Sequence, residues 1–345
     1  MELSKNNCRQ VWVDNVKVIA CILVVLCHFV QSMVKSNIIG DYYIIDSINK
    51  AIYYFHMPLF FICSGYLYQK FSKVYTFKSW GRNVLKKFLA LGIPYFTFAT
   101  FSWAIKVVFS SQVNNQAGGF VDNIFLNPIP PYWFLYALFF IFVFTPSFKS
   151  IKVARVSIVL AVLLRIALIL LRGHLALVPY FVIKIMEYEL WFVIGMYIAL
   201  ANIDIKAMSN KKYFNIAVVC GILFVIFSTL VAIFNIDYEI LGVLLGALAC
   251  FAVVFVIGYI YRNNEQNAFF EFMTKYTMPL FLMHTIFAAT LRSLLFKIGI
   301  QSSFLHILLG LIITFAGPII AGIIMKKTKI LDFFLYPTRF IKIKL

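Results

Sequence analysis

Residues 14–29 read DNVKVIACILVVLCHF, an apolar run with two charged side chains near its start and a histidine near its end. Apolar residues continue past His28 toward Lys35, which gives the roughly 20 residues that a helix needs to cross a bilayer. An ionisable side chain is costly in lipid, so it faces protein or water instead. The stretch therefore predicts a membrane-spanning helix whose polar face carries Asp14, Lys17 and His28.

Lys17 and His28 share one face of that helix. Eleven residues make three turns plus about 20°, and the two positions lie about 16 Å apart along the axis. We predict Lys17 near the cytosolic boundary and His28 beyond the midplane, toward the outer leaflet. Imidazole transfers protons readily near neutral pH, which makes His28 a candidate catalytic base. The alternative is that Lys17 extends to the interface and His28 only packs against another helix.

The rest of the chain has the same apolar character. Hydrophobic residues make up 63% of the 345 and charged residues only 13%, whereas soluble domains are about 45–50% apolar. A soluble fold of this size cannot bury that much apolar surface, so we predict an all-α polytopic membrane protein. About ten spans are expected, at residues 16–36, 51–69, 88–110, 132–148, 156–172, 178–201, 213–234, 239–261, 276–296 and 304–325.

Charge orients these spans. The net charge of +18 raises the possibility of nucleic-acid binding. We reject it, because the basic residues fall in short clusters between apolar runs, as in cytosolic loops. The basic residues at the predicted outside ends of spans are Lys35, Lys50, Arg172 and Lys297, and the outside segment 111–131 has none. Both termini are therefore predicted to be cytosolic.

The remaining composition argues for a single domain. The six cysteines form no CxxC pair and all but Cys8 lie in apolar runs, so we expect neither disulfides nor a metal site. Glu2, Asp14 and the lack of a small-residue cleavage site predict that the first helix is retained. We expect one integral-membrane domain over residues 1–345 without an appended soluble domain. The segment 173–186 is ambiguous and fits a short interfacial or re-entrant piece.

The second span, YYFHMPLFFICSGYLYQK at residues 53–70, carries further candidates. His56 lies near its outer end, and Pro58 can open the local hydrogen-bond ladder. Ser64 and Gly65 favour close helix packing. A catalytic serine is the weaker interpretation, because no acidic residue accompanies Ser64 and His56 at triad-like positions.

Three later spans also carry polar side chains. Tyr132 and Trp133 at an outer boundary are interpreted either as belt residues or as platforms for sugar rings. Glu189 lies within an apolar run, and Arg165 is a candidate partner by depth. His284 is predicted about a third of the way in from the cytosolic side, as another histidine within the membrane.

Taken together, the ordered motifs resemble those of the integral-membrane acyltransferase-3 family. The ordered set of motifs in matching spans is specific, and the resemblance covers about residues 1–290. The second-span motif is similar to that of the sugar O-acetylase branch. The motifs are DNVK with His28, FHMPLFFICSGY at 55–66, IPY at 93–95, YWFLY at 132–136, LWFVIGM at 190–196 and LMH at 282–284.

This resemblance implies about ten helices and transfer of an acyl group from cytosolic acyl-CoA to a hydroxyl at the outer side of the membrane. His28 is the implied essential residue, with Lys17 where arginine is common in the family and Asp14 placed to orient it. The family's R-x-x-R pair aligns with Lys87 and Ala90 here, so this chain departs from the pattern. A loop with Arg82, Lys86 and Lys87 is the expected site for the donor's phosphates.

The expected function is O-acetylation. The co-substrate is acetyl-CoA with no tightly bound cofactor, and the acceptor is an extracytoplasmic glycan or glycolipid at a bacterial plasma membrane. His28 acts as general base or forms a transient acyl-histidine. The candidate substrate-binding residues are His56, Ser64, Tyr132, Trp133, Glu189 and His284. The alternatives are a transporter or flippase of a saccharide-linked lipid, which suits the same ionisable residues, and a membrane sensor or assembly subunit.

Overall fold

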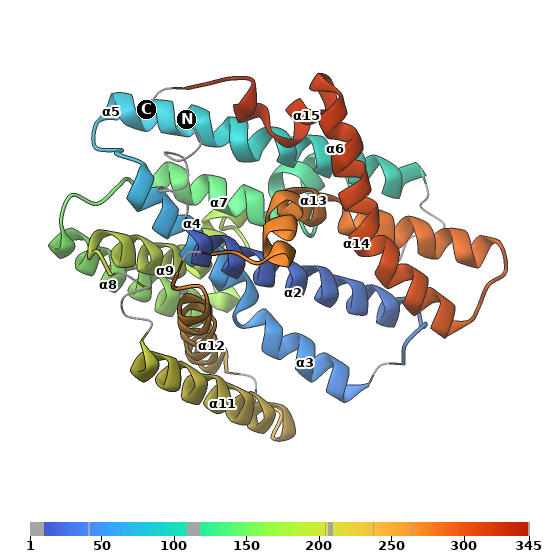
Figure 1. Cartoon of the computed structure of the whole chain (residues 1–345), viewed down its shortest axis with the longest axis horizontal. Coiled ribbons are helices and arrows are strands. Elements are labelled where there is room, and N and C mark those ends of the chain that lie inside the picture. The colour runs from blue at the N-terminus through green and yellow to red at the C-terminus, as the bar shows by residue number, and fades with distance from the viewer. Residues whose placement is uncertain are drawn as a thin grey trace. The chain divides into compact units, whose positions relative to one another are not determined.

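The computed structural model describes residues 10–40, 42–108, 118–203, 205, 210–236, 238–263 and 265–343, and its regular structure there is entirely helical (Figure 1). Cys8 lies outside the described residues. Residues 111–117 of the predicted outside segment also lie outside them. The helices in chain order are α2 (Val11–Lys35), α3 (Tyr43–Tyr53), α4 (His56–Phe71), α5 (Phe77–Lys87), η1 (Phe88–Gly92), α6 (Ile93–Val108), η3 (Asp122–Leu126), α7 (Trp133–Phe144), α8 (Ile151–Leu170), η4 (Arg172–His174), α9 (Tyr180–Leu200), α11 (Lys211–Ile233), α12 (Glu239–Ile260), α13 (Ala268–Lys297), α14 (Ser303–Lys327), α15 (Lys329–Leu335) and η5 (Pro337–Arg339).

Long apolar helices make this a polytopic membrane protein. Within the described residues, seven helical runs are long and apolar enough to cross a bilayer: α2, the run Phe77–Val108, α8, α11, α12, α13 and α14. Helix α11 exposes apolar side chains such as Val219 and Val225 along most of its surface, which is favourable only against lipid. Helices α4 and α7 are shorter, and α9 carries charged residues, so the count of ten spans stays a prediction.

Two predicted spans have different boundaries in the structure. Residues 51–69 are not one segment, because α3 ends at Tyr53 and α4 begins at His56. Pro58 is therefore in the first turn of α4, where its missing N–H would have no helical partner. The prediction that Pro58 opens the ladder within a span is wrong. The ambiguous segment 173–186 divides into the end of η4, a turn, and the first residues of α9.

The basic loop predicted before the third span is instead helix α5. Thr76 caps this helix in a reciprocal pair with Ser79. Trp80 and Val84 lie one turn apart, an apolar spacing that helices use for packing. The Trp80 indole donates to the Val143 carbonyl oxygen at 2.7 Å, which holds α5 against the end of α7. Arg82, Lys86 and Lys87 are thus on a helix.

The chain forms two compact units. The first comprises Met1–Leu23, Tyr42–Lys70 and Trp191–Thr277, and in it α11 lies beside α12 (Figure 1). The second comprises Val24–Asp41, Phe71–Leu190 and Met278–Leu345.

Within the first unit, α4 and the second half of α9 cross at two glycines. A Cβ on Gly65 would overlap the carbonyl oxygen of Phe192. A Cβ on Gly195 would likewise overlap the carbonyl oxygen of Ile62. The predicted packing role of Gly65 is confirmed, and it requires a second glycine on the partner helix.

Candidate active site

In the second unit, His28 of α2 meets His284 of α13. The centroids of the two imidazole rings are 5.4 Å apart, with 37° between the ring planes. Helix α13 begins at Ala268, eight residues before the predicted start of that span, so His284 lies near the middle of the helix. The depth of His284 in the membrane stays a prediction, and the two histidines form one site.

The tautomer of His284 follows from its backbone contacts. Its Nδ1 lies 2.8 Å from the Leu280 carbonyl oxygen and 3.1 Å from that of Phe281. Carbonyl oxygens only accept, so Nδ1 carries the proton and Nε2 presents a lone pair. Among the described residues, Nε2 of His284 is buried without a hydrogen-bond partner. Nε2 of His284 can therefore accept a hydrogen bond from a bound hydroxyl. The His28 side chain, by contrast with the buried His284, is half-buried.

One turn beyond His28, the same two helices are joined by an arginine. Arg292 of α13 is 5% exposed and donates to the hydroxyl and the carbonyl oxygen of Ser32 on α2. A buried guanidinium in a membrane span requires such partners. Phe29, Met33 and Ala288 pack together beside this contact. Sequence reasoning missed Arg292, although its spacing of eight from His284 places both on one helical face.

Tyr132 supports the histidine pair from the amino end of α7. It is fully buried, and its hydroxyl donates to the Leu282 carbonyl oxygen at 2.9 Å, two residues before His284. Both interpretations of Tyr132, as a belt residue and as a platform for sugar stacking, are therefore wrong. Its contact fixes the position of α13 where His284 projects. No signal in the sequence distinguishes this role from that of an interfacial tyrosine.

Trp133 lies in a separate aromatic group. Its ring is 5.3 Å from that of Tyr188, and the Lys184 ammonium lies 4.7 Å from the centroid of its indole. Lys184 also pairs with Glu187 at 2.6 Å. A cation over an indole face is a favourable contact. The Trp133 ring is therefore already in contact with two side chains of the protein, those of Tyr188 and Lys184. Its role in substrate binding stays a prediction.

Glu189 has a different partner from the one expected. Thr145 donates to its Oε1 at 2.7 Å. Among the described residues Arg165 makes no ion pair with Glu189, so that predicted pairing is wrong. Thr145 follows the end of α7 at Phe144, six residues short of α8, and this early helix end brings its hydroxyl to the carboxylate.

Four predicted site residues belong to the first unit. His56 is buried, with Nδ1 2.8 Å from the Ile52 carbonyl oxygen and its ring 4.7 Å from that of Tyr53. Ser64 is half-buried on the same helix, and eight residues separate it from His56 by about 12 Å along the axis. That distance rules out direct activation of Ser64 by His56.

The charges near the start of α2 also lie in the first unit. Asp14 and Lys17 are both half-buried. The Cys63 thiol of α4 donates to the Val13 carbonyl oxygen at 3.9 Å, so this end of α2 lies beside α4. The spacing that places Lys17 and His28 on one unbroken helix is confirmed, because α2 runs from Val11 to Lys35.

The three basic side chains of α5 expected to hold the donor differ in exposure. The Lys87 ammonium lies 3.6 Å from the centroid of the Phe142 ring, and Asn83 donates to the Phe142 carbonyl oxygen at 3.5 Å. Arg82 is exposed and Lys86 half-exposed. Of these three side chains, Arg82 is therefore the most accessible to a soluble anion. Within the part of the chain that the structure describes, no group of three or more His, Cys, Asp or Glu residues is arranged to hold a metal.

These observations define an integral-membrane protein with an imidazole pair on two long helices. Residues 10–323 match the family model described as an acyltransferase domain, and the chain belongs to the acyltransferase-3 family of membrane acyltransferases. This match extends over both compact units and includes both histidines.

Two curated relatives were found. Nodulation protein NolL of Sinorhizobium fredii is 32% identical over 162 residues, which are 47% of this chain and 43% of the relative. Nodulation protein NolL of Mesorhizobium japonicum is 29% identical over 137 residues, 40% of this chain and 35% of the relative. The match thus spans less than half the length of either relative. No solved structure matches this chain.

Proposed function

We propose that this membrane acyltransferase is an O-acetyltransferase. Its donor is acetyl-CoA from the cytosol, and its acceptor is a hydroxyl of a cell-surface or lipid-linked glycan at the outer side of a bacterial plasma membrane. The observation that supports the proposal is the contact of His28 with His284 within the matched acyltransferase domain. Both matched relatives come from bacteria.

In the proposed reaction, an imidazole nitrogen of His28 removes the proton of the acceptor hydroxyl. The acceptor oxygen attacks the thioester carbonyl carbon, a C–O bond forms, and the C–S bond breaks. The imidazolium of His28 then returns its proton to the leaving thiolate, which departs as the free thiol of CoA. General-base assistance of this kind typically contributes about 10²–10⁴-fold.

His284 has a positioning role in this proposal. Its Nε2 lone pair accepts a hydrogen bond from the N–H of the neutral His28 ring, which leaves the other nitrogen of His28 free to take the acceptor proton. The hydrogen bond from Nδ1 to the Leu280 carbonyl oxygen holds the ring in this orientation.

We expect His284→Phe, which keeps an aromatic ring but no acceptor atom, to lower kcat about tenfold or more at unchanged KM for acetyl-CoA. His284→Gln retains an acceptor oxygen and should keep more activity than the phenylalanine variant. The measurement is steady-state acetyl transfer by both purified variants. Equal losses in the two variants, or a rise in KM alone, would assign His284 a packing role instead.

Lys17 is proposed to attract the negatively charged donor toward the inner end of α2. We expect Lys17→Ala to raise KM for acetyl-CoA about fivefold, the equivalent of about 1 kcal/mol for one partly exposed charge. Lys17→Arg is the matched control and should keep the affinity of the wild type. An unchanged KM and kcat in the alanine variant would remove Lys17 from the site.

The proposal is tested in cells by deleting the gene and comparing O-acetyl content of the surface glycan with that of the parent strain. Loss of acetylation that the wild-type gene restores is the expected result. Unchanged acetylation, with accumulation of lipid-linked saccharide inside the cell, would favour a flippase and contradict the proposal.

A further inference from the structure

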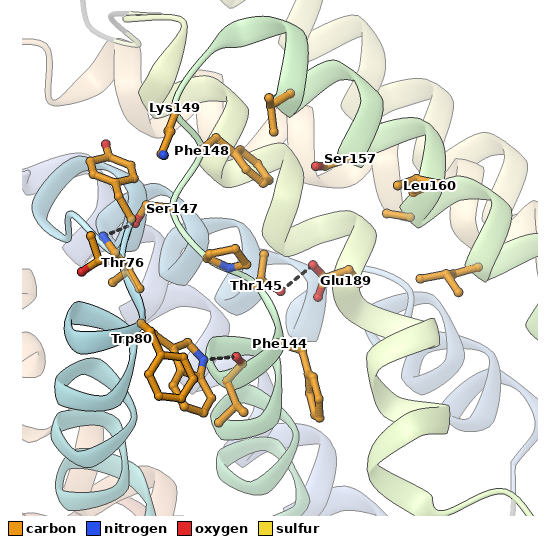
Figure 2. A pocket seen from close by; sticks show the side chains of 18 residues that line it. Thr76, Trp80, Phe144, Thr145, Ser147, Phe148, Lys149, Ser157, Leu160 and Glu189 are labelled. Atoms are coloured by element: carbon orange, nitrogen blue, oxygen red, sulfur yellow. Dashed lines mark hydrogen bonds between the residues drawn. The ribbon is translucent and has the colours of Figure 1, made fainter.

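The second unit contains a cavity that no histidine lines. It encloses about 790 Å³. The segment before α5, the segment after α7, one face of α8, and Glu189 of α9 line it (Figure 2). The predicted orientation of the chain places this region at the cytosolic boundary of the membrane, where the basic residues Lys149 and Lys152 follow α7.

One wall of this cavity contains the buried carboxylate of Glu189, and one of its two oxygens accepts no hydrogen bond from the described residues. Glu189 is 9% exposed, and Thr145 donates to its Oε1, as the dashed line in Figure 2 shows. Its Oε2 is buried and has no hydrogen-bond partner among the described residues. A buried acceptor without a donor is destabilising, and an unpaired buried charge is more so. The cavity therefore favours a ligand that carries a strong donor or a positive charge.

The mouth of the cavity offers the opposite charge. Lys149 is exposed, with its ammonium 6.0 Å from the centroid of the Tyr75 ring. Lysine at a membrane boundary attracts phosphate. Carboxylate and ammonium on two sides of one cavity complement a ligand with an ammonium and a phosphate group.

The third feature is an apolar wall on α8. Leu160 is 55% exposed and Leu164 39% exposed, and both line the cavity. Helix α8 is one of the helices able to span the bilayer, and most of its surface is not covered by protein. An acyl chain can therefore lie along this wall and continue into the surrounding lipid.

We propose that this cavity binds a phospholipid with a primary ammonium headgroup, of the phosphatidylethanolamine type. The ammonium donates to Oε2 of Glu189, the phosphate faces Lys149, and an acyl chain lies along Leu160 and Leu164. This site lies beyond the proposed acetyl transfer, and its test does not depend on any acetyl donor or acceptor.

The test uses the full-length protein purified in detergent and incubated with phosphatidylethanolamine or phosphatidylglycerol. Bound lipid is counted by native mass spectrometry, and thermal stability is measured in parallel. We expect the wild type to retain phosphatidylethanolamine and to be stabilised by it. Glu189→Gln should reduce its affinity about tenfold or more, because the neutral amide cannot pair with an ammonium.

Glu187→Gln is the matched control, since Glu187 is two residues away, pairs with Lys184 and does not line the cavity. It should bind the lipid as the wild type does. Lys149→Ala changes an exposed side chain, so it should leave the fold intact, and it should also weaken binding.

Three results would overturn the proposal. The first is wild-type retention of phosphatidylethanolamine by Glu189→Gln or by Lys149→Ala. The second is equal, Glu189-dependent binding of phosphatidylglycerol, which has no ammonium. The third is Glu189-dependent displacement of the lipid by acetyl-CoA, which would assign the cavity to the acyl donor.

Discussion

Replacing His28 with alanine is expected to abolish O-acetylation of the surface glycan in cells. Without an imidazole at this position, the pair loses the proposed base for the acceptor proton. Loss of a general base lowers the rate about 10²–10⁴-fold, which leaves acetylation near the background of a deletion strain. The measurement is O-acetyl content of the purified glycan, normalised to the abundance of the variant in the membrane.

His174→Ala is the matched control for His28→Ala. His174 is an exposed histidine in the turn between α8 and α9, where a truncation removes no buried contact. It should leave acetylation unchanged. Acetylation at the wild-type level in cells that hold normal amounts of His28→Ala would contradict the assigned role of His28.

Replacing Gly195 with leucine is expected to remove most of the folded protein from the membrane. Any side chain here meets the Ile62 carbonyl oxygen and the Tyr66 amide of α4, and backbone atoms cannot rotate away as a side chain would. Overpacking against side chains typically costs about 1–3 kcal/mol, and separating two helices adds the loss of their packing. Fluorescence-detected size exclusion of detergent extracts measures the remaining monodisperse protein.

Gly81→Ala provides the control for this substitution. Gly81 also lies within a helix, but a Cβ there meets no atom within 4 Å. Alanine has the higher helix propensity, so this variant should be as abundant as the wild type or more so. Equal abundance of Gly195→Leu and wild type would show that α4 and α9 do not depend on this close approach.

The sequence predicts the class of fold because apolar runs and basic clusters report directly on lipid and cytosol. Each of the ten predicted spans overlaps a helix. Boundaries were less predictable where amphipathic residues extend a helix beyond its apolar part. Helix α13 begins at Ala268, before the apolar run that predicts its span. Helix α5 includes the basic residues that the sequence predicts as a loop. In both cases polar residues extend the helix beyond its apolar part.

The site was predictable in part. Residue spacing on α2 identifies His28, and its neighbour His284 carries its own signal as an ionisable residue in an apolar run. Their contact was not predictable, since 256 residues separate them and the pattern of one helix does not reveal its partners. The same limit applies to the bond between Thr145 and Glu189, for which depth alone favoured Arg165.

Acetyl transfer by purified protein in lipid vesicles tests the central claim most directly. Acetyl-CoA with a labelled acetyl group is supplied together with the lipid-linked saccharide fraction of a deletion strain, and released CoA thiol and labelled saccharide are measured. The account predicts one thiol released for each acetyl group transferred by the wild type, and neither product from His28→Ala. Saccharide that crosses the vesicle membrane with no release of CoA, or equal transfer by both proteins, would contradict it.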